Sequence, residues 1–265
     1  MEKLDFLGIE GDNSLDRRNI CIYSFDSVDS TNSLARRMAM SGEAKAPALI
    51  IADGQTGGRG RMGRSFYSPS DTGIYMTLLF DVTEDISASV MRMTSAVSVA
   101  VSVAIENVTG RRVGIKWVND LYLDGRKICG ILAESFLSGN RRYAAVGVGI
   151  NLCTKDFPEE LAGIAGSLTD KKENLLRREL ALATCCEIFD IYEKIRQGDI
   201  SYLQEYRRRS VVLGKRVNFV ADGVTSTGVA LSVGDDGALC VRCDDGSERY
   251  LCSGEITLRI SEETK

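Results

Sequence analysis

Apolar residues recur along the chain with two spacings, one typical of strands and one typical of helices. Short apolar or alternating runs predict strands at residues 20–25, 48–52, 74–80, 113–117, 120–123, 127–134 and 142–152. Apolar residues at helical spacing predict helices at residues 31–40, 87–108, 173–196 and 200–209. The polar segment before the first strand predicts a frayed end or one short helix. Strands and helices are therefore interleaved up to about residue 210.

The helix at residues 31–40 has recognisable ends. Ser30 or Thr31 can cap its start, because short hydroxyl side chains accept hydrogen bonds from the first backbone N–H groups. Gly42 can end it, because glycine adopts the left-handed conformation at little cost. Further on, Asp124-Gly125 predicts a tight hairpin turn between two strands.

The last fifty residues change character into short β runs. These runs are predicted at residues 216–220, 226–232, 238–242, 248–251 and 256–260, separated by glycine- and aspartate-rich turns. This spacing favours a small closed barrel. We therefore predict an N-terminal extension (residues 1–19), a first domain (20–210) and a C-terminal barrel domain (211–265).

Composition and charge exclude several classes of protein. The formal net charge is −4 and the pI is about 5.2, which argues against a protein that coats nucleic acid. The first residues lack the apolar core of a signal peptide. No window approaches ~18 uninterrupted apolar residues, so no membrane span is predicted.

Cysteine and histidine usage limits the chemistry further. The chain has eight cysteines and no histidine, which excludes Ser-His-Asp catalysis and histidine-based metal sites. Cys240 and Cys243, with Cys252, invite a zinc interpretation. They lie in a strand pattern without a second Cys-x-x-Cys pair, and structural zinc prefers four ligands. We predict no metal ligands, and free thiols rather than a disulfide framework.

The segment from Gly57 to Arg64 combines four glycines and three arginines. Glycines allow a close backbone approach, and arginines suit carboxylate and phosphate oxygens. The segment is therefore either a cationic clamp over an anionic ligand or a solvated basic turn. Its Gly-x-Gly-x-x-Gly spacing matches a dinucleotide fingerprint, but the strand predicted from residue 74 leaves no room for the helix that such a site requires.

A second group of polar residues surrounds the hairpin predicted at residues 113–134. Lys116 and Lys127 come from neighbouring strands, with Asn119 and Asp120 between them. If both lysines share a face, they concentrate positive charge as transfer of a phosphoryl group requires. Ordinary surface lysines are the alternative. In the strand that follows, Gly147-Val-Gly149-Ile-Asn151 indicates close approach by a ligand or tight packing against a helix.

Taken together, these motifs resemble the catalytic core of bacterial biotin protein ligases over roughly residues 20–262. The motifs are Asp29-Ser30-Thr31-Asn32, Gln55-x-x-Gly58-Arg59-Gly60-Arg61-x-Gly63-Arg64, Lys116-Trp117-x-Asn119-Asp120, Lys127-x-x-Gly130-Ile131-Leu132 and Gly149-Ile-Asn151. The C-terminal Gly237-Ala238-Leu239 and Gly254–Arg259 resemble the small terminal barrel of these enzymes. The resemblance implies an α+β fold: a mixed catalytic sheet flanked by helices, as in class II aminoacyl-tRNA synthetases, with an SH3-like barrel.

The resemblance also implies an activity and a set of site residues. Biotin would be activated with ATP and Mg²⁺ to biotinyl-5′-AMP, then transferred to a lysine of a biotin carboxyl carrier domain in the cytoplasm. The implied catalytic residues are Lys127, Arg61, Lys116 and Asp120. Biotin-binding residues would be Ser30, Thr31, Asn32, Gln55, Gly58, Arg59, Gly60, Arg61, Lys127 and Gly130. Nucleotide-binding residues would be Arg61, Phe66, Lys116, Asn119, Ile131 and Asn151. A homodimer is left open.

Two departures from the family pattern matter. Val118 stands where these ligases usually have proline, which could loosen the turn that places Asn119. Nineteen residues before the first strand cannot hold the helices of a DNA-binding domain, so we expect a single-function ligase without DNA as a partner. The alternatives are a lipoate ligase of the same fold and a non-catalytic sensor of biotinyl-adenylate.

Overall fold

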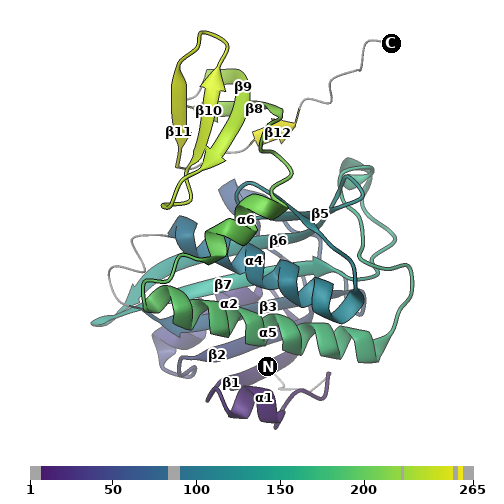
Figure 1. Cartoon of the computed structure of the whole chain (residues 1–265). Coiled ribbons are helices and arrows are strands. Elements are labelled where there is room, and N and C mark those ends of the chain that lie inside the picture. The colour runs from purple at the N-terminus through teal and green to yellow at the C-terminus, as the bar shows by residue number, and fades with distance from the viewer. Residues whose placement is uncertain (1–6, 83–89, 222–223, 253–255, 259–265) are drawn as a thin grey trace.

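The computed structural model describes residues 7–82, 90–221, 224–252 and 256–258. Its larger part is a seven-stranded sheet with the order β1-β2-β3-β7-β6-β5-β4 (Figure 1). These strands are β1 (Cys21–Val28), β2 (Ala48–Gln55), β3 (Gly73–Asp81), β4 (Gly114–Lys116), β5 (Asp120–Leu123), β6 (Arg126–Ser138) and β7 (Arg141–Asn151). β1 pairs parallel with β2 and the other neighbours pair antiparallel, so the sheet is mixed as predicted.

Helices cover both faces of this sheet (Figure 1). The helices are α1 (Asn13–Asp16), α2 (Thr31–Ser41), α4 (Val90–Thr109), α5 (Asn174–Arg196) and α6 (Tyr202–Arg209), with short 3₁₀ turns at Arg61–Gly63 and Glu159–Leu161. Strand β2 shows why both faces are apolar. Leu49 and Ile51 belong to the core cluster on the side of α4 and α5, and Ile50 belongs to the cluster on the side of α2. Alternating side chains point to opposite faces.

The ends of α2 match the prediction only in part. Gly42 ends the helix in the left-handed conformation, with φ of 78°. Ser30 is at the N-cap position but makes no side-chain cap hydrogen bond. The Thr31 hydroxyl lies 3.2 Å from Gln55 Oε1, outside the helix. The prediction that one of these hydroxyls caps α2 is therefore wrong, because both face the cavity described below.

The C-terminal residues form a second, antiparallel sheet with the order β11-β10-β9-β8-β12. Its strands are β8 (Arg216–Ala221), β9 (Val224–Val233), β10 (Leu239–Cys243), β11 (Glu248–Leu251) and β12 (Ile256–Leu258). Within the described ranges the two edge strands, β11 and β12, do not pair with each other. The sheet is therefore not the closed barrel that the strand spacing predicted. All eight cysteines are free.

The second sheet is attached to the first beside the β4–β5 hairpin (Figure 1). Trp117 donates from its buried indole Nε1 to the Gly237 carbonyl at 3.0 Å. On α6, Arg207 donates to the Val233 carbonyl at 2.8 Å. A buried indole N–H left without a partner is costly, so the first of these bonds fixes the turn between β9 and β10 against the hairpin. None of the helices in the described ranges is long and apolar enough to cross a membrane.

Glu205 on α6 gives the fold a testable pH dependence. Hydrogen bonds from Arg208 and Arg209 lower the pKa of Glu205 from 4.5 to about 2. The charged Glu205 carboxylate therefore stabilises the folded state above pH 4.5, and this stabilisation is lost as the pH falls toward 2. We expect Glu205→Gln to reduce the free energy of unfolding by about 1 kcal/mol at pH 7, with the difference narrowing below pH 4.5.

Denaturant unfolding at pH 7 and pH 3 checks this expectation. Glu193→Gln is a matched control, because Glu193 forms an i,i+3 pair with Arg196 at 3.3 Å on the surface of α5. Surface pairs of this kind contribute little, so the control should leave both values unchanged. If Glu205→Gln reduces the free energy of unfolding equally at both pH values, the charge of Glu205 does not have the role assigned to it.

Candidate active site

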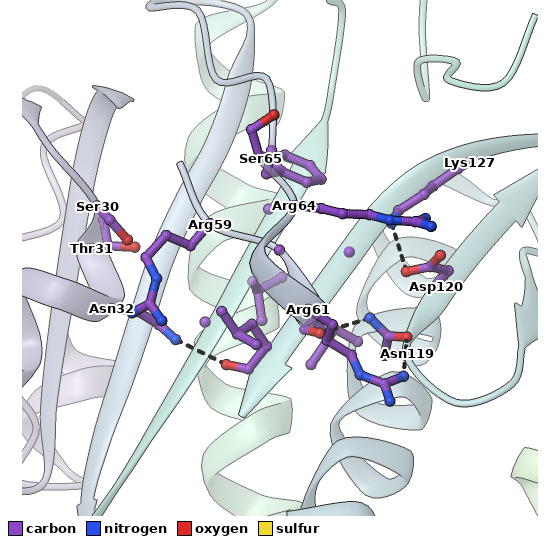
Figure 2. Close-up of a pocket in the computed structure, with 18 of the residues that line it drawn as sticks. Ser30, Thr31, Asn32, Arg59, Arg61, Arg64, Ser65, Asn119, Asp120 and Lys127 are labelled. Carbon is purple, nitrogen blue, oxygen red and sulfur yellow. Dashed lines mark hydrogen bonds and ion pairs between the residues drawn. The ribbon is translucent and has the colours of Figure 1, made fainter. Parts of the chain in front are cut away.

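One cavity of about 250 Å³ collects nearly all the residues that the sequence singled out. It lies between the glycine-arginine segment, the start of α2 and strands β4 to β7 (Figure 2). The predicted residues that line it are Ser30, Thr31, Asn32, Gln55, Arg59, Gly60, Arg61, Phe66, Lys116, Asn119, Asp120, Lys127, Gly130 and Ile131. Gly58 and Asn151 were predicted but do not line it. The other lining residues were not in the predicted set: Arg64, Ser65, Trp117, Leu132, Gly147, Val148, Gly149 and Ile256.

A β-bulge turns Lys127 toward this cavity. In the β5–β6 ladder, Asp120 pairs with Gly130, but Tyr122 pairs with Lys127, and the register shifts by one residue between these pairs. Without the shift, Tyr122 would pair with Ile128 and the Lys127 side chain would point to the opposite face. Because of the bulge, Lys127 shares a face with Asp120.

Lys127 and Asp120 form a close ion pair inside the cavity. Lys127 Nζ lies 2.7 Å from Asp120 Oδ1, and the two side chains are 28% and 21% exposed. Lys116 pairs with Asp120 across the β4–β5 ladder, so it lies on the same face. Its Nζ is 3.4 Å from the Tyr122 hydroxyl and 5.3 Å from the centre of that ring. The hypothesis that both lysines concentrate charge on one face fits this geometry.

Tyr122 stays protonated next to these groups. Burial and the Asp120 carboxylate raise the pKa of Tyr122 to about 12. The ring therefore offers Lys116 a neutral hydroxyl and an aromatic face, and it adds no charge to the cavity.

Asn119 is held firmly although valine replaces the usual proline before it. Its side-chain Nδ2 donates to the Ile131 carbonyl at 3.0 Å, and its backbone carbonyl accepts from the Ile131 N–H at 3.0 Å. The Val118 carbonyl accepts from Ser98 on α4 and Tyr206 on α6, both at 3.3 Å. Two helices therefore support the turn, which meets the concern that Val118 loosens it.

The glycine-arginine segment folds as a small hairpin over the cavity. Gly60 N–H donates to the Arg64 carbonyl at 2.7 Å, and Phe66 N–H donates to the Gly58 carbonyl at 2.9 Å. The tip turns at Met62, with φ of 54°, and at Gly63, with φ of 74°. Gly58 is required by packing, since a Cβ there would lie 2.4 Å from the Phe66 carbonyl.

The arginines of this hairpin have different partners. Arg61 donates to Asn119 Oδ1 at 3.0 Å and so connects the tip of the hairpin to the β4–β5 turn. Arg59 instead makes a bidentate ion pair with Glu134 on β6. The cavity is lined by Arg59, Arg61, Arg64, Lys116 and Lys127 against the single carboxylate Asp120 among its described lining residues. This excess of positive charge favours an anionic ligand.

The strand glycines have two different neighbours. Gly147 lies against helix α2, where an added Cβ would be 2.2 Å from Asn32 Oδ1. At Gly149 and at its ladder partner Gly130, an added Cβ would lie 2.5 Å and 3.2 Å from the Phe66 ring. Gly147 therefore allows close packing against the helix, as one of the two alternatives predicted. Gly149 and Gly130 instead make room for an aromatic side chain, and both strand glycines line the cavity, where approach by a ligand stays a prediction.

The polar wall next to α2 keeps some hydrogen-bonding capacity for a ligand. Gln55 Oε1 accepts from the backbone and hydroxyl of Thr31, and Gln55 Nε2 donates one proton to Ser68. The second Nε2 proton and the Ser30 hydroxyl remain available at the cavity. Asn32 differs, because its amide donates to both Leu132 and Glu134 and its Oδ1 accepts from Thr77.

Asn151 lies just outside the cavity lining, at the end of β7. Its Nδ2 donates to the Gly166 carbonyl at 3.1 Å, while its buried Oδ1 has no hydrogen-bond partner. Gly166 N–H in turn donates to the Lys127 carbonyl at 2.9 Å. The loop after β7 is therefore tied to the backbone of Lys127.

Comparisons with known proteins agree on one family. Residues 24–151 match the biotin/lipoate A/B protein ligase family, and residues 212–259 match the biotin protein ligase C-terminal domain. The bifunctional ligase/repressor BirA of Bacillus subtilis is 32% identical, over 88% of this chain and 72% of its own length. The biotin–[acetyl-CoA-carboxylase] ligase of Mycobacterium tuberculosis is 30% identical, over 80% and 79%.

Solved structures give the same result. Biotin protein ligase from Aquifex aeolicus in complex with biotin and ATP superposes with a TM-score of 0.76 at 26% identity, covering 90% of this chain and 98% of that one. The Leishmania major ligase in complex with biotinyl-5-AMP gives 0.57 at 26% identity, covering 87% and 98%. The chain therefore belongs to the biotin protein ligase branch of the biotin/lipoate A/B protein ligase family.

Proposed function

We propose that this chain is an ATP-dependent biotin protein ligase that acts on a biotin carboxyl carrier domain. The observation that carries the proposal is one cavity that combines a cationic hairpin, the Lys127–Asp120 pair and a neutral hydrogen-bonding wall. Biotin needs both kinds of surface, because one of its ends is a carboxylate and the other a neutral ureido ring.

The first reaction joins two anions. A carboxylate oxygen of biotin attacks the α-phosphorus of ATP, the bond to the β-phosphate oxygen breaks, and pyrophosphate leaves. The carboxylate is already ionised at neutral pH, so this step needs no general base. The difficulty is repulsion and developing charge, which Lys127, Lys116 and Arg61 offset from fixed positions.

Individual roles follow from position. Lys127 faces the carboxylate and the transferring phosphoryl group. Lys116 and Asn119 serve the nucleotide, while Phe66 offers a face for the adenine. Asn151 lies outside the cavity lining and supports the site through its hydrogen bond to the Gly166 carbonyl. Gln55 and Ser30 offer a donor and a hydroxyl to the ureido ring, which would be costly to bury unpaired.

The second reaction transfers the acyl group. The amine of the acceptor lysine attacks the acyl carbon of biotinyl-5′-AMP, an amide forms, and AMP leaves with the electrons of the acyl–oxygen bond. At neutral pH the acceptor lysine is an ammonium ion, which loses one proton to solvent before its amine attacks, and the amine loses a second proton as the amide forms. Asp120 is the carboxylate on the cavity wall next to Lys127, and it can accept that proton.

Magnesium enters the proposal with ATP as the substrate. In the described ranges no group of three or more acidic or cysteine side chains is placed to hold a metal ion. Mg²⁺ keeps several water molecules and binds readily through phosphates, so one carboxylate in the cavity is enough for a magnesium–nucleotide complex.

A lipoate ligase is the nearest alternative activity. A lipoyl group has no ureido ring, so it would leave the free Gln55 proton and the Ser30 hydroxyl without partners. Exchange of pyrophosphate into ATP, measured with biotin and with lipoate at equal concentrations, separates the two. Exchange with biotin only is expected, and exchange with lipoate only would overturn the proposal.

The proposal extends to the domain division, the compartment and the competing sensor function. Two separate sheets support a division into two domains near Ser210. Free thiols, two of them exposed, favour a reducing compartment such as the cytoplasm. A non-catalytic sensor of biotinyl-adenylate is disfavoured, because Lys116 and Lys127 both remain in the cavity.

A further inference from the structure

Glu134 connects two walls of the site that are far apart in the sequence. Its Oε1 accepts from Arg59 Nη2 at 2.9 Å, and its Oε2 accepts from Arg59 Nη1 at 3.2 Å and from Asn32 Nδ2 at 3.0 Å. Figure 2 shows Arg59 and Asn32 side by side at the edge of the pocket. One carboxylate therefore joins the glycine-arginine hairpin to helix α2.

The connection continues around the cavity to the other end of the hairpin. Asn32 is fixed above Gly147, where no Cβ would fit, and its Oδ1 accepts from Thr77 at 2.7 Å. From there, contacts of 2.8 to 2.9 Å run from Thr77 to the Thr31 hydroxyl, from the Thr31 N–H to Gln55 Oε1, and through Ser68 to the Phe66 carbonyl. The hydrogen bonds thus form a ring that holds the hairpin at Arg59 and at Phe66.

We propose that Glu134 is a positioning residue that couples occupation of the Ser30–Gln55 wall to closure of the hairpin. A ligand hydrogen-bonded at this wall restrains Thr31 and Gln55, and through the ring it restrains Asn32 and Glu134. The carboxylate then holds Arg59, and with it the hairpin, over the bound adenylate. The inference rests on the proposed function, since it names what keeps the reactive intermediate enclosed.

A purely structural ion pair is the alternative. The Arg59 side chain is 46% exposed and that of Glu134 is 28% exposed. Pairs this exposed add little to global stability, so replacing Glu134 should act on the hairpin and leave the melting temperature unchanged. Glutamine is the suitable replacement, because its amide keeps the shape and one acceptor but loses the charge and the bidentate geometry.

The release rate of the intermediate tests the coupling. Protein loaded with labelled biotin and ATP is chased with excess unlabelled biotin, and loss of labelled biotinyl-adenylate is followed. We expect Glu134→Gln to release it roughly 3- to 10-fold faster, as when a charge-assisted pair becomes a neutral one. Arg59→Gln should match it, and the double variant should be no faster than either. Glu193→Gln is the control and should release at the parental rate.

If the parental protein makes no adenylate, that result counts against the proposed function alone. Hydrogen exchange of the backbone amides, measured on the ligand-free chain, then still tests the role of Glu134. Exchange at Gly60 and Phe66 should be faster in Glu134→Gln than in the parental protein, while exchange in α5 stays equal. Unchanged protection at both amides would overturn the role of Glu134. In a protein that does form adenylate, an unchanged release rate or additive effects of the two substitutions would also overturn it.

Discussion

Replacing Lys127 with alanine is expected to lower biotin-dependent exchange of pyrophosphate into ATP by at least roughly 100-fold, the effect of losing one preorganised donor to a transition state. The β-bulge places Lys127 Nζ in the cavity, 2.7 Å from Asp120. Lys116 is held at the Tyr122 hydroxyl on the neighbouring strand, so it does not replace the ammonium group of Lys127. Steady-state exchange, with circular dichroism to show an intact fold, is the measurement.

Two further variants test whether the loss of exchange is specific to Lys127. Lys215→Ala removes an exposed lysine just before strand β8 and should leave exchange at the parental rate. Asp120→Asn keeps Lys127 and should impair transfer to an acceptor lysine more than it impairs exchange. Normal exchange in Lys127→Ala would remove the role assigned to this residue.

Arg61→Gly is expected to release biotinyl-adenylate faster than the parental protein. Each 1.4 kcal/mol taken from the free energy that favours the closed hairpin corresponds to roughly 10-fold faster release. Its guanidinium carries the bond from the hairpin tip to Asn119. Glycine removes that bond and also increases the conformational freedom of the open hairpin. Escaped adenylate would label lysines on bystander proteins, so biotin incorporation into serum albumin, together with a chase of labelled adenylate, measures the effect.

Met62→Gly is the matched control for that experiment. Met62 is 74% exposed and already has a positive φ of 54°, which glycine adopts easily. The substitution therefore adds a glycine to the same hairpin without removing the bond to Asn119. If Arg61→Gly retains adenylate as long as the parental chain, the hairpin does not act as a clamp.

Local signals made much of the fold predictable. Strands such as β2 and β7 are continuous apolar runs because both faces are covered, and Gly42 ends α2 as its position predicts. The hairpin at Asp124-Gly125 forms with both residues at positive φ. Pairing between β11 and β12 depends on contacts between distant segments, which strand spacing alone does not determine.

The residues of the candidate site were predicted from the resemblance of their motifs to a known family, but the connections between these residues were not. A bulge depends on one unpaired residue, Ile128, which looks like any other apolar strand position. Glu134 is the last residue of the strand predicted from Lys127, yet nothing local shows that it accepts hydrogen bonds from Arg59 and Asn32. Ser30 and Thr31 carry the signature of a helix cap, and only the tertiary fold directs their hydroxyls into the cavity.

Transfer of labelled biotin to a carrier domain, in the presence of ATP and Mg²⁺, tests the proposed ligase most directly. We expect one label per carrier domain, dependent on ATP, and lost when the acceptor lysine is replaced by arginine. Formation of biotinyl-adenylate with no label on any carrier would instead identify a sensor. The absence of both products, with active transfer of lipoate, would contradict the ligase proposed here.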